Sequence, residues 1–251
     1  MTCLNGKTII VTGAARGLGQ AIAVAAAREG ANLALIDIDA DGLRDVVREV
    51  SEYGAQVRDY IVDLRQRKEL QRAIDDIAVV FRGIDVLVNN AMWVRYEPLS
   101  EIQPETVHRM FDVGFNATLW GVQAVTPHMA MKGNGSIINI TSPASVHGIP
   151  NAAVYCAVKG AVSAFTRQCA VELGAQDIRV NAIAPGPSKT PGAVAVVSES
   201  GWEARLRRTP LARLSTPQEI ADIAIFLASS ASRCITGDVI FGDGGRSIST
   251  L

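Results

Sequence analysis

Short apolar segments alternate with longer helical ones along this chain, and this alternation restricts the possible folds more than any other feature. The short segments are rich in Val, Ile and Ala and lie at residues 8–11, 32–36, 56–62, 86–88, 136–141, 179–183 and 239–241. Helical patterns lie between them, at residues 17–29, 41–53, 66–81, 105–131, 152–174 and 217–228. Strands that are apolar on both faces are typical of a parallel sheet covered by helices on each side. The order predicts an α/β fold with a three-layer, doubly wound parallel sheet of about seven strands.

The composition fits one self-contained domain over residues 1–251. A chain of this length with 48% hydrophobic residues buries about 70% of its unfolded surface, which is enough for one core and short for two domains. We find no linker, low-complexity tract or repeat that would divide it. Residues 186–208 are irregular and rich in Pro, Gly and Ser, and we expect them to form a substrate lid.

Charge and targeting signals exclude several classes of protein. The net charge of −1 lacks the positive excess of a nucleic-acid-binding protein. The longest stretch without charged residues, 133–158, contains several Gly and Pro residues and is not predicted to be a membrane helix. With no secretion signal and no C-x-x-C pair, we expect a cytoplasmic protein with reduced thiols. His108, His128 and His147 are dispersed, which argues against a catalytic metal.

A glycine cluster follows the first predicted strand and leads directly into the first predicted helix. It reads Thr-Gly-Ala-Ala-Arg-Gly-Leu-Gly over residues 12–19. Glycines at such a junction let the backbone approach a pyrophosphate, whose charge is stabilised by the free N–H groups of the helix N-terminus. The residues expected to hold a nucleotide here are Gly13, Arg16, Gly17, Leu18 and Gly19.

Asp37 lies at the end of the second predicted strand, 18 residues beyond Gly19. An acidic side chain there accepts hydrogen bonds from both ribose hydroxyls and repels a 2′-phosphate, which favours NAD. Arg16 favours NADP instead, because an arginine near the adenosine end pairs with that phosphate. We weigh Asp37 more heavily, since it lies where the ribose is expected. The alternative role of Asp37 is a helix cap or a solvated turn residue.

Together with further motifs, the spacing of Thr12, Gly13, Gly17 and Gly19 resembles the classical short-chain dehydrogenase/reductase family, which has a Rossmann-like fold. The further motifs are Asp63-Leu64, Asn89-Asn90-Ala91, Tyr155-x-x-x-Lys159, Asn181-Ala182, Pro185-Gly186-x-x-x-Thr190 and Gly242-Asp243-Gly244-Gly245. The resemblance covers essentially the whole chain. It implies that Asp63 lies near the adenine amino group and Asn90 along the adenine ribose, although a strand-to-loop turn would also use Asn90. The other nucleotide contacts it implies are Leu64, Pro185 and Gly186, with Ser188 and Thr190 near the nicotinamide carboxamide.

Tyr155 and Lys159 are four residues apart on a predicted helix, so their side chains leave the same face. A free tyrosine, with a pKa of about 10, is a poor base at neutral pH. A close ammonium, helped by a positive nicotinamide ring, is expected to lower that pKa by about three units. The resemblance implies that Ser142 binds the substrate oxygen, that Tyr155 moves the proton, and that Lys159 also holds the nicotinamide ribose. The alternative is a packed tyrosine and a lysine with a buried stem.

Two residues depart from the family pattern. The family carries an Asn where this chain has Gly114, and that Asn holds a water molecule that relays protons to the lysine. We hypothesise that the volume freed at Gly114 holds an extra water that keeps the relay working. Met92 replaces the Gly of the Asn-Asn-Ala-Gly pattern and is predicted to reshape the pocket wall near the nicotinamide.

The predicted function is NAD-dependent interconversion of a secondary alcohol, a polyol or a ring hydroxyl, and a ketone. Arg95 would bind a carboxylate or remain a solvated surface residue, and His147 would bind a polar substrate or make a hydrogen bond within its own loop. Two alternatives remain: an NADPH-dependent ketoreductase, and a nucleotide-binding sensor or scaffold with weakened catalysis. The resemblance also implies a homotetramer. The residues expected to face the substrate are Trp93, Arg95, Ser142, His147, Tyr155 and Trp202.

Overall fold

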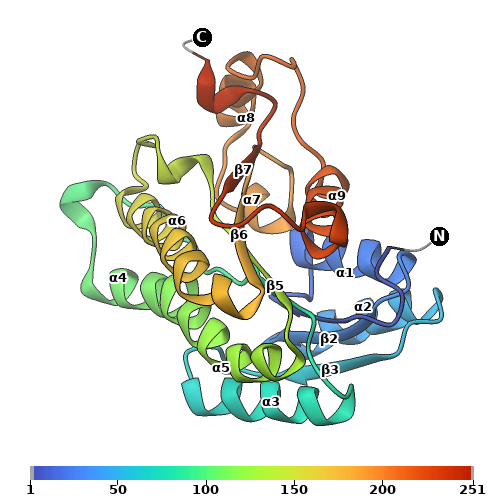
Figure 1. Cartoon of the computed structure of the whole chain (residues 1–251). Helices are drawn as coiled ribbons and strands as arrows, with labels where there is room; N and C mark the ends of the chain where they lie inside the picture. Colours follow the sequence, from blue (N-terminus) through green and yellow to red (C-terminus); the bar gives the residue numbers. More distant parts are fainter. Residues whose placement is uncertain (1–2, 250–251) are drawn as a thin grey trace.

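A parallel sheet of seven strands forms the centre of the molecule, as seen in the computed structural model, which describes residues 3–249 (Figure 1). Every predicted strand is present, and the order across the sheet is β3-β2-β1-β4-β5-β6-β7. This confirms the doubly wound α/β fold. The strands are β1 (Thr8–Thr12), β2 (Asn32–Asp37), β3 (Val57–Ile61), β4 (Val86–Asn89), β5 (Gly135–Ile140), β6 (Ile178–Pro185) and β7 (Val239–Gly242).

Helices cover both faces of the sheet, which explains why the central strands are apolar on both sides. Successive residues of β1 point in opposite directions: Ile9 and Val11 belong to one apolar cluster and Ile10 to the other. The first cluster packs under α1 (Gly17–Arg28), α2 (Ala40–Ser51) and α9 (Pro217–Ala228). The second lies against α3 (Arg67–Val80), α5 (Ala117–Lys132) and α6 (Ala153–Leu173). Short 3₁₀ turns occur at Leu99–Glu101, Pro143–Ser145, Gly174–Gln176, Ser230–Ser232 and Arg246–Ile248.

The direction of winding reverses at β1, which pairs with β2 on one side and with β4 on the other. In open parallel sheets, this reversal leaves a crevice outside the carboxyl ends of the two strands that flank it. The glycine cluster follows β1 and Asn90 follows β4. The topology therefore places both motifs at the mouth of one crevice.

The predicted helix over residues 105–131 is interrupted, which corrects the sequence-based expectation. Helix α4 (Pro104–Phe111) ends in a π-helical turn, Asp112–Asn116, before α5 begins at Ala117. Gly114 lies in the middle of this turn and is buried. Glycine weakens a regular helix, and π turns, although rare, are frequently found at functional sites.

The predicted lid over residues 186–208 contains two short helices, α7 (Pro191–Val194) and α8 (Glu199–Arg207). Each helix begins at a hydroxyl residue that caps it: Thr190 accepts a hydrogen bond from Ala193 N, and Ser198 accepts one from Gly201 N. Trp202 anchors α8, because its ring is buried and lies close to the Lys189 ammonium and the Arg205 guanidinium. The segment is therefore ordered around an aromatic anchor.

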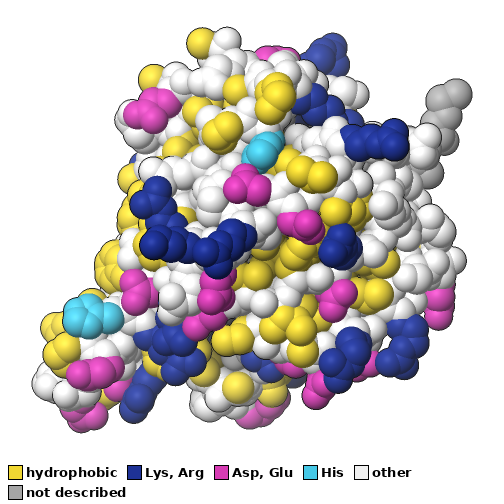
Figure 2. All heavy atoms as spheres, turned by 90° about the horizontal axis from the view of Figure 1, so that it is seen from below, with side chains coloured by type: hydrophobic (Ala, Val, Ile, Leu, Met, Phe, Trp, Pro, Cys, Tyr) yellow, Lys and Arg dark blue, Asp and Glu magenta, His cyan; other side chains and the backbone are white. Residues whose placement is uncertain are grey.

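The surface seen from the side of α3, α4 and α5 carries positive and negative side chains interspersed with small apolar areas (Figure 2). Such mixing gives this face no large field of one sign. Within residues 3–249, every helix is too short or too polar to cross a lipid bilayer.

Candidate active site

A cavity of about 560 Å³ opens at the carboxyl ends of the strands, within the size range of small-molecule sites. It extends from the glycine cluster after β1 to the lid after β6. All but one of the predicted nucleotide residues line it. These are Gly13, Arg16, Gly17, Leu18, Asp37, Asp63, Leu64, Asn90, Tyr155, Lys159, Pro185, Gly186, Ser188 and Thr190.

Gly19, the exception, packs behind the glycine loop. A Cβ there would overlap the carbonyl oxygen of Gly13, so only glycine lets α1 start this close to the loop. Gly17 has a φ of +64°, a backbone conformation that favours glycine. Arg16 precedes α1 and provides no side-chain cap, so the first N–H groups of the helix have no side-chain acceptor. This local geometry fits a pyrophosphate.

Asp37 fastens the end of β2 to the glycine loop. Its carboxylate accepts hydrogen bonds from Ala15 N at 3.0 Å, Ile38 N at 2.7 Å and Asp39 N at 3.1 Å. The cap of α2 is Asp39, which accepts from Gly42 N, so Asp37 is not a helix cap. The turn alternative holds, because Asp37 Oδ1 accepts from the next two backbone N–H groups. The Asp37 carboxylate therefore provides a fixed negative charge at this end of the cavity.

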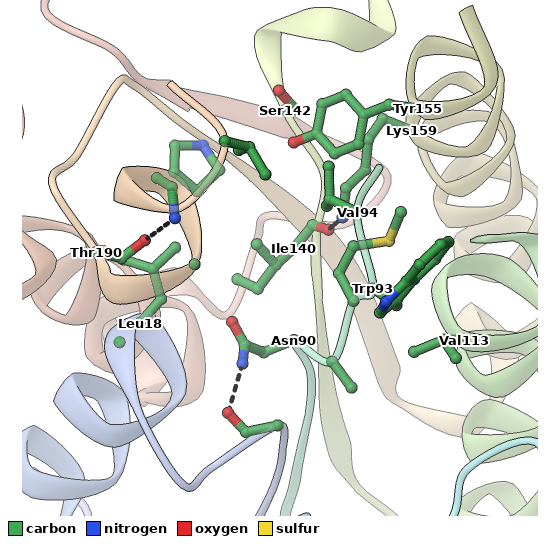
Figure 3. A pocket seen from close by; sticks show the side chains of 18 of the residues that line it. Leu18, Asn90, Trp93, Val94, Val113, Ile140, Ser142, Tyr155, Lys159 and Thr190 are labelled. Carbon is green, nitrogen blue, oxygen red and sulfur yellow. Dashed lines mark hydrogen bonds between the residues drawn. The ribbon is translucent and has the colours of Figure 1, made fainter. Parts of the chain in front are cut away.

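Asn90 and Asp63 are also held by neighbouring residues. The Asn90 side-chain amide donates to Thr12 O and Gly13 O, both at 3.0 Å, and its oxygen is turned the other way (Figure 3). This ties β4 to the glycine loop. Asp63 is bound through both carboxylate oxygens to the Arg65 guanidinium, and this hydrogen bonding lowers the pKa of Asp63.

Ser142, Tyr155 and Lys159 meet at one wall of the cavity (Figure 3). Ser142 follows β5, whereas Tyr155 and Lys159 lie one turn apart on α6. The Ser142 hydroxyl accepts a hydrogen bond from Ala144 N and lies on the same wall as the Tyr155 phenol. The Lys159 ammonium donates to Ile140 O at 2.7 Å and lies 5.9 Å from the centre of the Tyr155 ring. The predicted catalytic residues are therefore close together.

Burial dominates the proton affinities of this group. It raises the pKa of Tyr155 above its ordinary value, with a smaller contribution from Tyr96, while the Ser142 hydrogen bond and the charge of Arg205 lower it. Burial lowers the pKa of Lys159 to about 8. The side chains of the protein by themselves therefore do not lower the pKa of Tyr155 in the way expected for a close Lys159 ammonium. The physical reason is that burial outweighs the favourable neighbours, and the ammonium bonds to a backbone carbonyl.

The lowered pKa of Lys159 predicts a pH-dependent stability. The unfolded chain holds this proton up to about pH 10.5 and the folded chain only up to about pH 8, so raising the pH between these values favours folding. Without added nucleotide, the unfolding free energy of the wild type should rise relative to that of Lys159→Met by about 3 kcal/mol over this interval. Urea unfolding of both proteins across the interval measures this difference. A difference that stays constant with pH would contradict the assignment.

Two predicted substrate residues lie outside the cavity lining, which corrects those expectations. Arg95 is exposed, and its Nε pairs with Glu97 Oε1 at 3.1 Å. His147 is also exposed, and its Nε2 donates to the Ser247 carbonyl at 3.0 Å. Each side chain is held by a partner that does not line the cavity. Arg95 is therefore a surface residue, as its alternative stated, whereas His147 bonds to the distant C-terminal segment and not within its own loop.

Trp93 and Trp202 do line the cavity, each in contact with an arginine. The Arg109 guanidinium lies 4.3 Å from the Trp93 ring centre, and the Arg205 guanidinium lies 5.3 Å from that of Trp202. Such stacking holds both rings and guanidinium planes in place.

The lining residues that were not predicted from the sequence include Tyr96, Arg205 and Arg246. Tyr96 packs edge-on against Tyr155, with ring centres 5.8 Å apart. Arg205 had a usable signal, because it lies three residues after Trp202 in a helix and so shares its face. Arg246 gave no comparable signal, since its position depends on how the C-terminal segment folds back.

The two departures from the family pattern are in direct contact. A Cβ added to Gly114 would lie 2.6 Å from Met92 Sδ and 2.6 Å from Val158 Cγ1. The space beside Gly114 is therefore filled by protein side chains. This corrects the hypothesis of an extra water there: Met92 occupies the volume that Gly114 leaves.

Comparison with known proteins assigns the family. A family model described as enoyl-(acyl carrier protein) reductase matches residues 13–247. The 5-keto-D-gluconate 5-reductase of Escherichia coli strain K12 is 37% identical over 243 residues, covering 96% of each chain. A 7α-hydroxysteroid dehydrogenase in complex with NADH and 7-oxo glycochenodeoxycholic acid has a TM-score of 0.93 at 34% identity, over 96% of this chain and 94% of the other. A gluconate 5-dehydrogenase from Burkholderia cenocepacia, in complex with NADP and tartrate, has a TM-score of 0.94 at 32% identity, over 98% and 97%.

The chain belongs to the short-chain dehydrogenase/reductase family. The named relatives are dehydrogenases and reductases that span nearly its whole length. The protein is therefore an oxidoreductase of the kind that acts on CH–OH groups.

Proposed function

We propose that this protein is an NAD-dependent oxidoreductase that interconverts a secondary alcohol, a polyol or a ring hydroxyl, and a ketone. One observation carries the proposal: Ser142, Tyr155 and Lys159 converge on a cavity whose other end fits a dinucleotide. Gly17, Asp37 and Asn90 would hold the pyrophosphate and adenosine, and Lys159, Ser188 and Thr190 the nicotinamide half. The nicotinamide, when bound, supplies the hydride acceptor for the alcohol or the hydride donor for the ketone.

The residues of the chain handle the proton and the substrate oxygen. The Ser142 hydroxyl binds that oxygen and fixes it beside the Tyr155 phenol. Tyr155 takes the hydroxyl proton in oxidation and returns it to the carbonyl oxygen in reduction. Ser142 and Arg205 both favour the phenolate that this exchange requires. Lys159, with a pKa of about 8, carries its charge at neutral pH and would hold the ribose.

Asp37 supports NAD over NADP, because its charge would repel a 2′-phosphate. Arg16 also lines the cavity, so NADPH-dependent ketone reduction remains the second candidate. We expect the wild type to bind NADH more tightly than NADPH, and Asp37→Asn to lower this preference about tenfold by removing the repulsion. Calorimetric titration with both nucleotides measures it. The matched control is Asp41→Asn, an exposed carboxylate on α2 that pairs with Arg44. A wild type that prefers NADPH would support the ketoreductase.

A panel of secondary alcohols tests the activity itself. Reduced nicotinamide formed at alkaline pH by the wild type, and not by Tyr155→Phe, is the expected result. If both proteins bind NAD and both are inert on the panel, the nucleotide-binding sensor or scaffold replaces the enzyme. The convergence of Ser142, Tyr155 and Lys159 favours the enzyme, because a sensor has no need for that arrangement.

Because the chain resembles this family, we propose that the protein assembles as a homotetramer. Exposed apolar side chains on α6 support an interface there: Ala157, Ala164 and Val171 recur every seven residues, on one face of the helix. Met131 at the end of α5 is also exposed. The cytoplasmic location and the single domain over residues 1–251 stay predictions, and residues 1–2 and 250–251 lie outside the described part.

A further inference from the structure

Two arginines from separate elements lie at the substrate end of the cavity. Arg205 belongs to α8 of the lid, and Arg246 begins the 3₁₀ turn Arg246–Ile248 that follows β7. That C-terminal turn lies beside α8 (Figure 1). Both arginines line the cavity, and both are half-buried. The fold therefore brings two guanidinium groups, 41 residues apart in the chain, to one pocket wall.

Among the described residues, no carboxylate pairs directly with the positive charge at this end. Among residues 3–249, neither guanidinium has a carboxylate oxygen within 4 Å. Asp243 acts on Arg246 from a greater distance, but its two oxygens accept hydrogen bonds from Gly245 N and Ser247 N. The acidic residues that line the cavity follow or end β2 and β3, at the adenosine end. These are Asp37, Asp39 and Asp63.

Arg205 lines the same cavity as Arg246 and Tyr155, and its charge acts on both. The charge of Arg205 lowers the pKa of Arg246, in addition to the larger effect of burial, and it lowers the pKa of Tyr155 as well. Stacking of Arg205 on the Trp202 ring fixes the plane of its guanidinium. Two half-buried cations that repel each other are stabilised by an anion placed between them.

We infer that the substrate is an anionic alcohol, a hydroxy acid whose carboxylate is bound by Arg205 and Arg246 while its secondary hydroxyl faces Ser142 and Tyr155. A planar guanidinium matches a carboxylate with two parallel hydrogen bonds. A neutral polyol offers no group to balance these charges. This inference rests on the proposed function and specifies its substrate class.

Matched acid and alcohol pairs test the inference by binding. The pairs are glycerate and glycerol, tartrate and threitol, and gluconate and glucitol. In the second member of each pair, hydroxymethyl groups replace the carboxylates. Each is titrated calorimetrically into the wild-type enzyme saturated with NADH. We expect at least one acid to bind about tenfold or more tightly than its neutral partner, because hydrogen bonds to a charged group are stronger.

The arginine variants locate the effect. Arg205→Gln and Arg246→Gln should each weaken binding of the preferred acid about tenfold and leave its neutral partner unchanged. Arg205→Lys, which keeps the charge and loses the planar fork, should recover part of the loss. The control is Arg207→Gln, on the same helix but outside the cavity lining and paired with Glu203. It should bind acids like the wild type.

The outcomes separate this inference from the proposed function. Equal binding of every acid and its neutral partner, no detectable binding of any acid, or unchanged binding in both arginine variants overturns the anionic substrate. Turnover of neutral secondary alcohols that depends on Tyr155 is measured separately. If no such turnover is found, the proposed activity is overturned. The preference for acids, and its loss in the arginine variants, is measured by binding and does not depend on turnover.

Discussion

Tyr155→Phe is expected to lower the rate of alcohol oxidation about 1000-fold, while the affinity for nucleotide changes less than about twofold. The substitution removes the phenol oxygen that exchanges the substrate proton. It keeps the ring that packs against Tyr96 at 5.8 Å, so the shape of the cavity is preserved. Steady-state turnover at saturating nucleotide and alcohol gives the rate, and calorimetric titration with NADH gives the affinity.

The matched control for this prediction is Tyr53→Phe. Tyr53 lies outside the cavity and bonds to Arg28 through its hydroxyl, so the same chemical change there should leave turnover at the wild-type level. Turnover of Tyr155→Phe within tenfold of the wild type would contradict the role of Tyr155 in proton exchange. A loss of nucleotide affinity equal to the loss of turnover would instead indicate a structural role.

Gly114→Asn is expected to destabilise the fold by about 3 kcal/mol, and the additional substitution Met92→Gly should cost only about 1 kcal/mol more, because the two changes partly compensate each other in volume. The new side chain would start 2.6 Å from both Met92 Sδ and Val158 Cγ1. The methionine is flexible enough to move, but the β-branched Val158 is stiff, so the helix would have to shift. Met92→Gly alone should also destabilise the fold by about 3 kcal/mol, because it leaves a cavity beside Gly114.

A double-mutant cycle measures this complementarity. Urea unfolding of the wild type, the two single variants and the double variant gives four unfolding free energies. We expect a coupling of about 2 kcal/mol in favour of the double variant. The matched control is Gly174→Asn, since a Cβ at Gly174 meets no atom within 4 Å. Strictly additive effects, or a Gly114→Asn variant as stable as the wild type, would show that the two positions do not fit each other.

The layered fold could be predicted because its determinants are local. Six of the seven strands are recognisable as mainly apolar runs, the exception being the edge strand β3, which carries Arg58 and Asp59. The alternation of Ile9, Ile10 and Val11 between the two clusters follows from strand geometry. The spacing of the glycines predicted the nucleotide end of the cavity for the same reason. Backbone conformation requires glycine at position 17, and close packing requires it at position 19. These requirements act within a few residues of the chain.

The features that sequence reasoning missed depend on contacts between distant segments. The π-helical turn at Gly114 fits around Met92 and Val158, which come from other elements. Arg95 and His147 lie in segments outside regular helices and strands, where a single partner sets the direction of the side chain. Arg205 and Arg246 meet only because α8 and the C-terminal turn fold over the same cavity. Their side-chain directions are results of tertiary packing.

Transfer of an isotopic label tests the central claim most directly. The claim is that this cavity moves a hydride from a secondary alcohol to a nicotinamide, with Tyr155 exchanging the proton. An alcohol carrying deuterium on its carbinol carbon is incubated with the enzyme and NAD, and the reduced nucleotide is analysed by mass spectrometry. The account predicts one deuterium per reduced nucleotide with the wild type and a rate about 1000-fold lower with Tyr155→Phe. Reduced nucleotide without the label, or equal rates for the two proteins, would contradict it.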